Sequence, residues 1–329
     1  MRDSFNREIC YLRVSVTDRC NLRCLYCMPK EGVSLLGHDD ILRYEEILRV
    51  IREAAALGIS KVRVTGGEPL VRRGLMDFLQ ALKGVPLEDL SLTTNGILLE
   101  VYAEKLFDAG VRRVNVSLDS LNAERYAQMT RGGNLHSVLR GIEKAEQIGF
   151  APIKINTVIV RGFNEDEILD IARLTLRKPY QVRFIELMPA GRIDVDVPEQ
   201  YLSADVIMAR ISAFRRLEAV NGGGSGTAGP ARMYRMEGAA GEIGFISPIS
   251  HHFCDLCNRL RLTADGHLRS CLLADDEIDL KVPLRSGCSD AELRDMIRRA
   301  VLRKPRRHGL AASAVPKRKS RKEMSRIGG

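Results

Sequence analysis

The sequence of 329 residues contains no run of 18 or more apolar residues, the length at which an apolar stretch becomes a candidate membrane-spanning helix. Its first twenty residues, MRDSFNREICYLRVSVTDRC, also lack the continuous apolar segment of a secretory signal peptide. These two absences argue against a membrane protein and against a secreted one. We therefore expect a cytoplasmic protein.

Excess positive charge is absent from most of the chain. The formal net charge is +9, but 12 of the 51 Lys and Arg residues and one of the 42 Asp and Glu residues fall in 298–329. That segment therefore carries +11 and the rest of the chain −2. A nucleic-acid-binding domain spreads basic residues over a folded face, so this distribution argues against nucleic acid as a partner. We expect residues 303–329 to form a flexible basic tail.

The cysteines of the sequence are clustered. Of eight cysteines, six fall in two groups: Cys20, Cys24 and Cys27, and then Cys254, Cys257 and Cys271. Cys10 and Cys288 stand apart, and we interpret them as packing thiols. In a reducing compartment clustered cysteines bind metal more often than they form disulfides. The two groups are therefore candidate metal sites.

Residues 9–213 alternate between β-rich runs and amphipathic helical stretches. Strands are predicted at Ile9–Thr17, Lys61–Thr65, Leu90–Thr94, Arg113–Leu118, Ile153–Val160 and Val182–Met188. Helices are predicted at Tyr44–Leu57, Gly74–Lys83, Glu100–Ala109, Leu135–Ile148, Glu165–Arg177 and Ser203–Phe214. Six successive strand–helix units predict parallel strands with right-handed crossovers, too few for a closed eight-stranded barrel. An α/β fold with a partial barrel or an open sheet follows, with functional residues at the C-terminal ends of the strands.

The Gly-rich segment 221–230, NGGGSGTAGP, interrupts this alternation and is interpreted as a loop or linker. We predict an α/β domain over 1–220 and a C-terminal region with the second cysteine group over 221–302. The basic tail, 303–329, ends in Gly-Gly.

The first cysteine group has the spacing C-x3-C-x2-C and directly follows the first predicted strand. Three thiolates on a short loop can bind three irons of a 4Fe–4S cluster and leave the fourth iron open to a small molecule. The alternative is a zinc site completed by His38. Zinc loops more often use C-x2-C pairs, so the spacing favours the cluster.

The second cysteine group has the spacing C-x2-C-x13-C. It fits either a structural zinc site, with His251 or His252 as the fourth ligand, or a second 4Fe–4S cluster with an open iron. Between these cysteines, Arg259 and Arg261 point to one face of a predicted strand. Two guanidinium groups on one face suit a phosphorylated ligand.

The first cysteine motif, with Tyr26 before its last cysteine, resembles the signature of the radical S-adenosylmethionine (SAM) superfamily. So does Gly66-Gly67-Glu68-Pro69, which follows the second predicted strand. The resemblance implies a partial (βα)6 TIM-type barrel and SAM bound at the open iron. It also implies a 5′-deoxyadenosyl radical that abstracts hydrogen from the substrate.

Segments along nearly the whole chain resemble one family of that superfamily, the GTP 3′,8-cyclases of molybdenum cofactor biosynthesis. They are TDRCNLRCLYCMP, RVTGGEPLVRR, LTTNG, NVSLD, GFISPISHHFCDLCNRLRLTADGHLRSCL and the terminal Ile327-Gly328-Gly329. This resemblance implies a radical SAM lyase that converts GTP into (8S)-3′,8-cyclo-7,8-dihydroguanosine 5′-triphosphate. The implied cofactors are SAM and two 4Fe–4S clusters, and the Gly-Gly tip is implied to reach into the barrel.

Matching the family's motifs assigns roles to residues of this sequence. Cys20, Cys24 and Cys27 would bind the cluster that binds SAM, and Cys254, Cys257 and Cys271 the cluster that faces the substrate. The residues implied to line the SAM site are Tyr26, Gly67, Ser117 and Met188. Those implied to bind GTP are Arg13, Arg63, Thr93, Lys154, Arg259 and Arg261, with the choice between Thr93 and Thr94 left open. No residue is assigned as an acid or base.

The resemblance also implies partners. These are GTP as substrate, an external electron donor, cyclic pyranopterin monophosphate synthase downstream and a second copy in a homodimer. Two rival interpretations are weighed. A radical SAM peptide maturase would carry more cysteines in its auxiliary region, and a zinc-binding interaction module would use the basic tail for nucleic acid.

Overall fold

The strands of the chain form one mixed sheet. In the computed structural model, which describes residues 1–220, 229–309 and 322–328, twelve strands pair in the order β12-β11-β10-β1-β2-β3-β4-β5-β6-β9-β8-β7. The central six are mutually parallel: β1 Tyr11–Ser15, β2 Lys61–Thr65, β3 Asp89–Thr94, β4 Arg113–Ser117, β5 Ile153–Ile159 and β6 Gln181–Glu186. The predicted run of six parallel strands is therefore confirmed.

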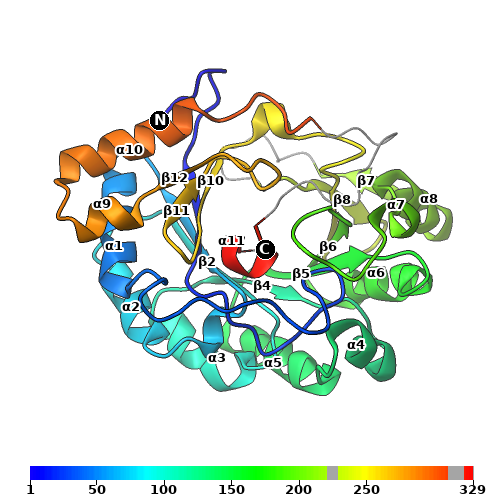
Figure 1. The fold of residues 1–329 in the computed structure, drawn as a ribbon. Coiled ribbons are helices and arrows are strands. Elements are labelled where there is room, and N and C mark those ends of the chain that lie inside the picture. Colours follow the sequence, from blue (N-terminus) through cyan, green and yellow to red (C-terminus); the bar gives the residue numbers. More distant parts are fainter. Residues whose placement is uncertain (221–228, 310–321, 329) are drawn as a thin grey trace.

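Strands from the C-terminal half extend this sheet on both sides. On one side β10 (Arg259–Leu262) lies parallel to β1, and on the other β9 (Glu242–Ile246) lies parallel to β6. The outer strands are antiparallel to their neighbours: β11 His267–Arg269, β12 Glu277–Asp279, β8 Arg232–Met236 and β7 Leu217–Ala219. The sheet curls into a partial barrel with β12 and β7 as its edges among the described strands (Figure 1).

Helices surround the barrel on its outer side (Figure 1). Their bounds are α1 Tyr44–Ala56, α2 Leu75–Leu82, α3 Leu99–Asp108, α4 Ala123–Thr130, α5 Leu135–Ile148, α6 Ile168–Arg177, α7 Val197–Gln200, α8 Ala204–Phe214, α9 Lys281–Arg285 and α10 Asp290–Leu302. Three short 3-10 helices are η1 Pro69–Val71, η2 Glu165–Glu167 and η3 Cys254–Leu256. All six predicted helical stretches are found. The sequence prediction missed α10, although Ser289 and Glu292 form a capping box at its start.

The side chains of each barrel strand alternate between the helices and the interior of the barrel. On β1, Leu12 and Val14 belong to the apolar core that also contains Val50 and Ile51 of α1. Alternation turns the other residues of β1, among them Arg13, to the interior. The barrel interior is therefore a polar space, and it holds most of the side chains of the candidate site.

The C-terminal end of the chain departs from the expected flexible tail. Lys304 is only 3% exposed, and 322–328 contain a short helix, α11 (Met324–Ile327), at the centre of the ring of strands in Figure 1. Ile327 is fully buried. These parts pack against the barrel because an apolar side chain and several buried hydrogen bonds hold them there. Most of the Gly-rich segment (221–228), residues 310–321 and Gly329 lie outside the described residues.

Within the described ranges, no helix is both long enough and apolar enough to cross a membrane.

Candidate active site

The first cysteine group lies on the loop that follows β1. The backbone N–H of Cys27 donates to the carbonyl oxygen of Cys24 at 2.9 Å, and the N–H of Leu22 donates to Sγ of Cys20 at 3.4 Å. Burial raises the pKa of Cys20 to about 11 and that of Cys27 to about 12. Burial also raises the pKa of Cys24, and negative charge on Cys27 and Cys20 raises it further. The three thiols therefore face one buried space and repel one another once ionised.

This donor set fits a 4Fe–4S cluster better than a single zinc ion. Three thiolates that repel one another need a cation between them, and in a cluster each thiolate binds a different iron. A structural zinc ion instead requires four ligands converging on one point. His38, which would have to be the fourth zinc ligand, is exposed.

The Gly66-Gly67-Glu68-Pro69 loop packs directly against the cysteine loop. The N–H of Gly67 donates to the carbonyl of Thr17 at 2.7 Å, and the N–H of Glu68 donates to that of Arg19 at 2.8 Å. A Cβ atom on Gly67 would collide with the Arg19 carbonyl group. Glycine is therefore required here by the approach of two protein backbones, in addition to any approach of a ligand.

Glu68, to which the sequence prediction gave no role, ties this loop to the end of β3. Its buried carboxylate accepts hydrogen bonds from Oγ1 of Thr94 at 2.9 Å and from the N–H of Asn95 at 2.7 Å. Burial raises the pKa of Glu68 to about 7, although these hydrogen bonds oppose the shift. The Asn95 side chain in turn donates to Asn21 at 2.8 Å, beside Cys20. Because the Thr94 hydroxyl is used here, the hydroxyl that faces the interior is that of Thr93.

Tyr26 and Ser117 lie on the same side of the barrel as the first cysteines. The Tyr26 hydroxyl donates to Oδ2 of Asp119 at 2.6 Å, and Oδ1 of Asp119 accepts from the N–H of Val158 at 2.9 Å. Burial raises the pKa of Asp119 to about 6. Asp119, in the loop after β4, thus fixes the Tyr26 ring and links the cysteine loop to strand β5.

Met188 follows β6 instead of ending it. The sequence predicted a strand to Met188, but β6 ends at Glu186, because its partner β9 ends at Ile246 and the chain soon reaches Pro189. Met188 is half-buried in the loop at the C-terminal end of the barrel. Its position agrees with the expectation that functional residues follow the strands.

The barrel interior concentrates buried cations. Arg13 on β1 pairs in register with Arg63 on β2 and with Arg261 on β10. Burial, with Arg261 and Arg63 nearby, lowers the pKa of Arg13 well below its usual value. Burial lowers the pKa of Lys154 to about 6, and positive charge on Arg183 and Arg63 adds to the effect. An anionic ligand would stabilise the charged forms of these basic side chains.

Arg183 belongs to this group but was missed from the sequence. It is 6% exposed, and burial followed by the charge of Arg63 lowers its pKa to about 9. Arg183 pairs in register with Asn156 of β5. Because inward-facing residues alternate along a strand, the position of Arg183 on β6 could have indicated that it faces the barrel interior.

Several polar atoms of the interior have no hydrogen-bond partner within the described parts of the chain. They include Oγ1 of Thr93, Oδ1 of Asn115, Oδ1 of Asn156, Nε of Arg183 and the hydroxyl of Tyr11. Buried polar groups are nearly always hydrogen-bonded in folded proteins. A concentration of such groups beside buried cations indicates a site for a polar, anionic molecule.

The second cysteine group lies at the opposite end of the barrel interior. Cys257 precedes β10, whose first residue pairs with the first residue of β1, whereas the first cysteine group follows the last residue of β1. Burial alone would raise the pKa of Cys257, but positive charge on Arg259 and Lys304 lowers it to about 6. Nη2 of Arg259 lies 3.8 Å from Sγ of Cys257. The two cysteine groups, which are far apart in the sequence, therefore lie at opposite ends of the basic barrel interior.

Lys304 joins the segments that carry the second group. Its ammonium group donates to the carbonyl of Arg259 at 2.8 Å and to that of Ser270 at 2.5 Å, next to Cys271. His251, the zinc ligand considered above, hydrogen-bonds Asp205 at 2.8 Å instead. Three thiols beside two cations, with that imidazole engaged elsewhere, fit a second cluster with an open iron.

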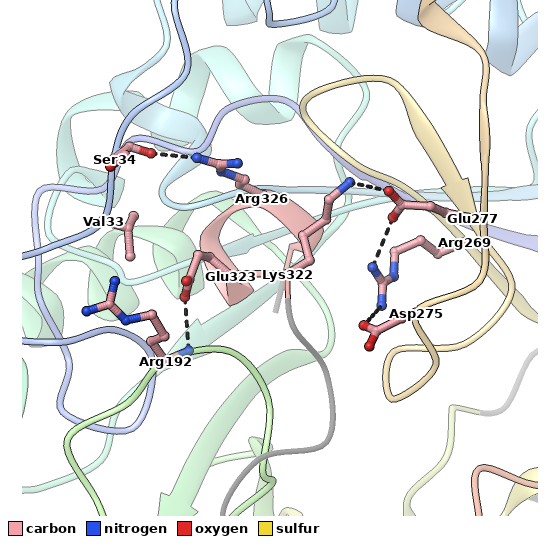
Figure 2. A pocket seen from close by; sticks show the side chains of 9 residues that line it. All are labelled: Val33, Ser34, Arg192, Arg269, Asp275, Glu277, Lys322, Glu323 and Arg326. Carbon is pink, nitrogen blue, oxygen red and sulfur yellow. Dashed lines mark hydrogen bonds and ion pairs between the residues drawn. The ribbon is translucent and has the colours of Figure 1, made fainter.

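The end of the chain reaches this interior from the side of the first cysteines. Arg261 donates to the carbonyl of Gly328 at 2.5 Å. A cavity of about 420 Å³ lies beside α11. Figure 2 shows the charged side chains that line it and hold the tail in place. Lys322 forms an ion pair with Glu277 at 2.9 Å, and Arg326 donates to the carbonyl of Ser34 at 2.7 Å (Figure 2).

Comparison with known families covers most of the chain. Residues 14–175 match the Radical SAM superfamily, and residues 180–310 match the family described as Molybdenum Cofactor Synthesis C. The first match ends before β6, so β6 and β9 belong to the second although they continue the same sheet.

Named relatives are similar over their full length. The chain is 52% identical to the GTP 3′,8-cyclase of Pelotomaculum thermopropionicum and 51% identical to that of Moorella thermoacetica, with complete coverage of both chains in each case. Among solved structures, Streptococcus suis SuiB bound to S-adenosylmethionine shares the fold, with a TM-score of 0.58 and 13% identity over 87% of this chain and 68% of SuiB.

Proposed function

The chain belongs to the GTP 3′,8-cyclase family of radical SAM enzymes. From this premise we propose which of its residues bind the clusters, SAM and GTP. The enzyme converts GTP to (8S)-3′,8-cyclo-7,8-dihydroguanosine 5′-triphosphate in molybdenum cofactor biosynthesis. It uses SAM and two 4Fe–4S clusters. Neither rival interpretation accounts for relatives of this identity over the full length.

Cys20, Cys24 and Cys27 hold the cluster that binds SAM in our proposal. When bound, this cluster and SAM together supply a 5′-deoxyadenosyl radical that removes hydrogen from C3′ of the GTP ribose. Tyr26, Gly67, Ser117 and Met188 line the SAM site. Support comes from the Tyr26–Asp119 hydrogen bond and from the packing of the Gly67 loop, which hold these residues near the cysteine loop.

GTP lies in the barrel interior with its base toward the second cysteine group, Cys254, Cys257 and Cys271. Its ligands in this proposal are Arg13, Arg63, Thr93, Lys154, Arg259 and Arg261, joined by Arg183. The observation that carries the proposal is the set of buried arginine and lysine side chains between the two cysteine groups. Guanidinium groups on adjacent strands suit the oxygens of a triphosphate.

The protein residues contribute orientation and the exclusion of water. Forming a bond between C3′ and C8 requires the ribose and the base to be held in one relative position. Cations at the phosphates and a metal site at the base would fix both ends of the substrate. The tail near Gly328 lies over the interior and would shield radicals from solvent.

We further propose an external electron donor, a downstream cyclic pyranopterin monophosphate synthase that receives the product, a homodimer and a cytoplasmic location. These follow from the family and not from a contact in this chain.

The test is anaerobic reconstitution followed by turnover. We expect about eight irons per chain, and 5′-deoxyadenosine with SAM, reductant and GTP but little with ATP in place of GTP. Equal 5′-deoxyadenosine with both nucleotides would contradict the substrate assignment. Zinc in place of iron at Cys254, Cys257 and Cys271 would contradict the second cluster.

A further inference from the structure

Tyr11 is a buried tyrosine of the barrel interior that no assigned role explains. It is the first residue of β1 and is 7% exposed. Its register partners are Arg259 on β10 and Lys61 on β2. Within the described chain its hydroxyl is buried and has no hydrogen-bond partner.

The neighbours of this side chain are the cations of the proposed GTP site. Tyr11 shares a face of β1 with Arg13, and the guanidinium carbon of Arg63 lies 5.5 Å from the centre of its ring. The guanidinium groups of Arg183 and Arg261 also lie within electrostatic range of the Tyr11 side chain. The hydroxyl therefore lies inside the basic cluster, away from the apolar core that contains Leu12.

An unpartnered hydroxyl at this place is costly unless a ligand uses it. Leaving a buried polar group without a hydrogen bond is unfavourable, and a phenol can donate one. Phosphate oxygens accept hydrogen bonds, and arginine and lysine side chains provide only donors. A neutral donor among these basic side chains matches an acceptor-rich anion and adds no further like-charge repulsion.

We propose that the Tyr11 hydroxyl donates a hydrogen bond to a phosphate oxygen of GTP and so adds a substrate-binding residue to the site. This inference rests on the proposed function, because it takes GTP as the anion that fills the interior. It concerns binding alone and requires no proton transfer.

The test compares Tyr11→Phe with a matched control, Tyr44→Phe. The Tyr44 hydroxyl is also buried without a partner in the described residues, but Tyr44 lies on α1, outside the barrel, where it stacks on Phe78 with ring centres 4.8 Å apart. Each substitution removes one oxygen and keeps the ring. Both variants should unfold at or above the temperature of the unchanged protein when GTP is absent, because each loses an unpartnered polar group.

Calorimetry with the anaerobically reconstituted enzyme measures the binding of GTP and of guanosine. We expect Tyr11→Phe to bind GTP about tenfold more weakly, as for a lost hydrogen bond to a charged group. Tyr44→Phe should bind GTP normally, and Tyr11→Phe should bind guanosine as the unchanged enzyme does. Normal GTP binding by Tyr11→Phe overturns the inference, and equal weakening for guanosine overturns the assignment to phosphate. If the unchanged enzyme binds no GTP, the proposed function fails instead.

Discussion

Lys154 is a buried lysine of the barrel interior whose pKa lies far below that of an exposed lysine. Burial, together with the positive charges of Arg183, Arg63 and Arg113, lowers its pKa to about 6 from the 10.5 of an exposed lysine. Between these pH values the unfolded chain holds a proton that the folded chain lacks. This residue therefore makes the free energy of unfolding rise with pH from about 6 toward 10.

Phosphate oxygens near Lys154 would favour its charged form and reverse the pKa shift. We therefore expect GTP binding at pH 8 to take up protons, with Lys154 contributing up to about one. Calorimetry in two buffers of different ionisation enthalpy measures this uptake. The uptake should decrease in Lys154→Met, and a binding enthalpy independent of the buffer would contradict the prediction.

At the scale of loops, the glycine loop after β2 and the cysteine loop after β1 form one packed unit. Gly67 has no room for a side chain, because the Arg19 and Asp18 carbonyl groups lie where a Cβ atom would be. Both loops must shift together if that space is filled.

We expect Gly67→Ala to lower the free energy of unfolding by about 1–3 kcal/mol, as overpacking does, and to weaken SAM binding. Thermal unfolding and SAM calorimetry of the reconstituted enzyme measure the two effects. The control is Gly84→Ala: Gly84 is exposed, and no atom lies nearer than 3.7 Å to a Cβ added there. If both variants behave alike, the close packing at Gly67 has no functional consequence.

Lys304 acts between β10 and the segment before Cys271. It hydrogen-bonds the carbonyls of Arg259 and Ser270 and places positive charge beside Cys257. A positive charge stabilises the reduced, more negative state of a nearby cluster and so raises its reduction potential.

We expect Lys304→Met either to lose the iron of the second site, leaving about four irons per chain, or to keep it at a more negative reduction potential. Iron analysis and redox titration followed by electron paramagnetic resonance separate these results. Arg303→Met is the control, because Arg303 is exposed one residue away and carries the same charge. Full iron content with an unchanged potential would contradict the role of Lys304.

For the whole molecule, the C-terminal end of the described chain reaches the barrel interior. Gly328 has a φ of 82°, and a Cβ atom there would lie 2.5 Å from Cγ2 of Thr65 on β2. Its carbonyl accepts from Arg261, a proposed GTP ligand. The tail therefore influences the position of a substrate-binding side chain from the far end of the sequence.

Deleting Gly328 and Gly329 should lower turnover of GTP while both clusters remain, because Arg261 loses its partner and the interior its cover. Product formation and iron content are measured on the same preparation. Unchanged turnover would show that the tail only packs against the barrel.

The sequence by itself determined the local features. Strands β2 and β5 and helix α5 match their predicted positions closely, because apolar alternation and terminal glycines act over a few residues. Cys20, Cys24 and Cys27 lie on one loop after β1, and their spacing favoured a cluster site over a zinc site.

Only the tertiary structure decided which residues lie next to or opposite one another in the barrel. The pairing of β1 with β10 puts Tyr11 beside Arg259 and the two cysteine groups at opposite ends of one interior. Burial made Arg183 and Lys304 part of the site, although in the sequence one is a strand arginine and the other belongs to a basic run. Such long-range register depends on how the whole sheet curls, and the charge of a side chain does not reveal whether folding will bury it.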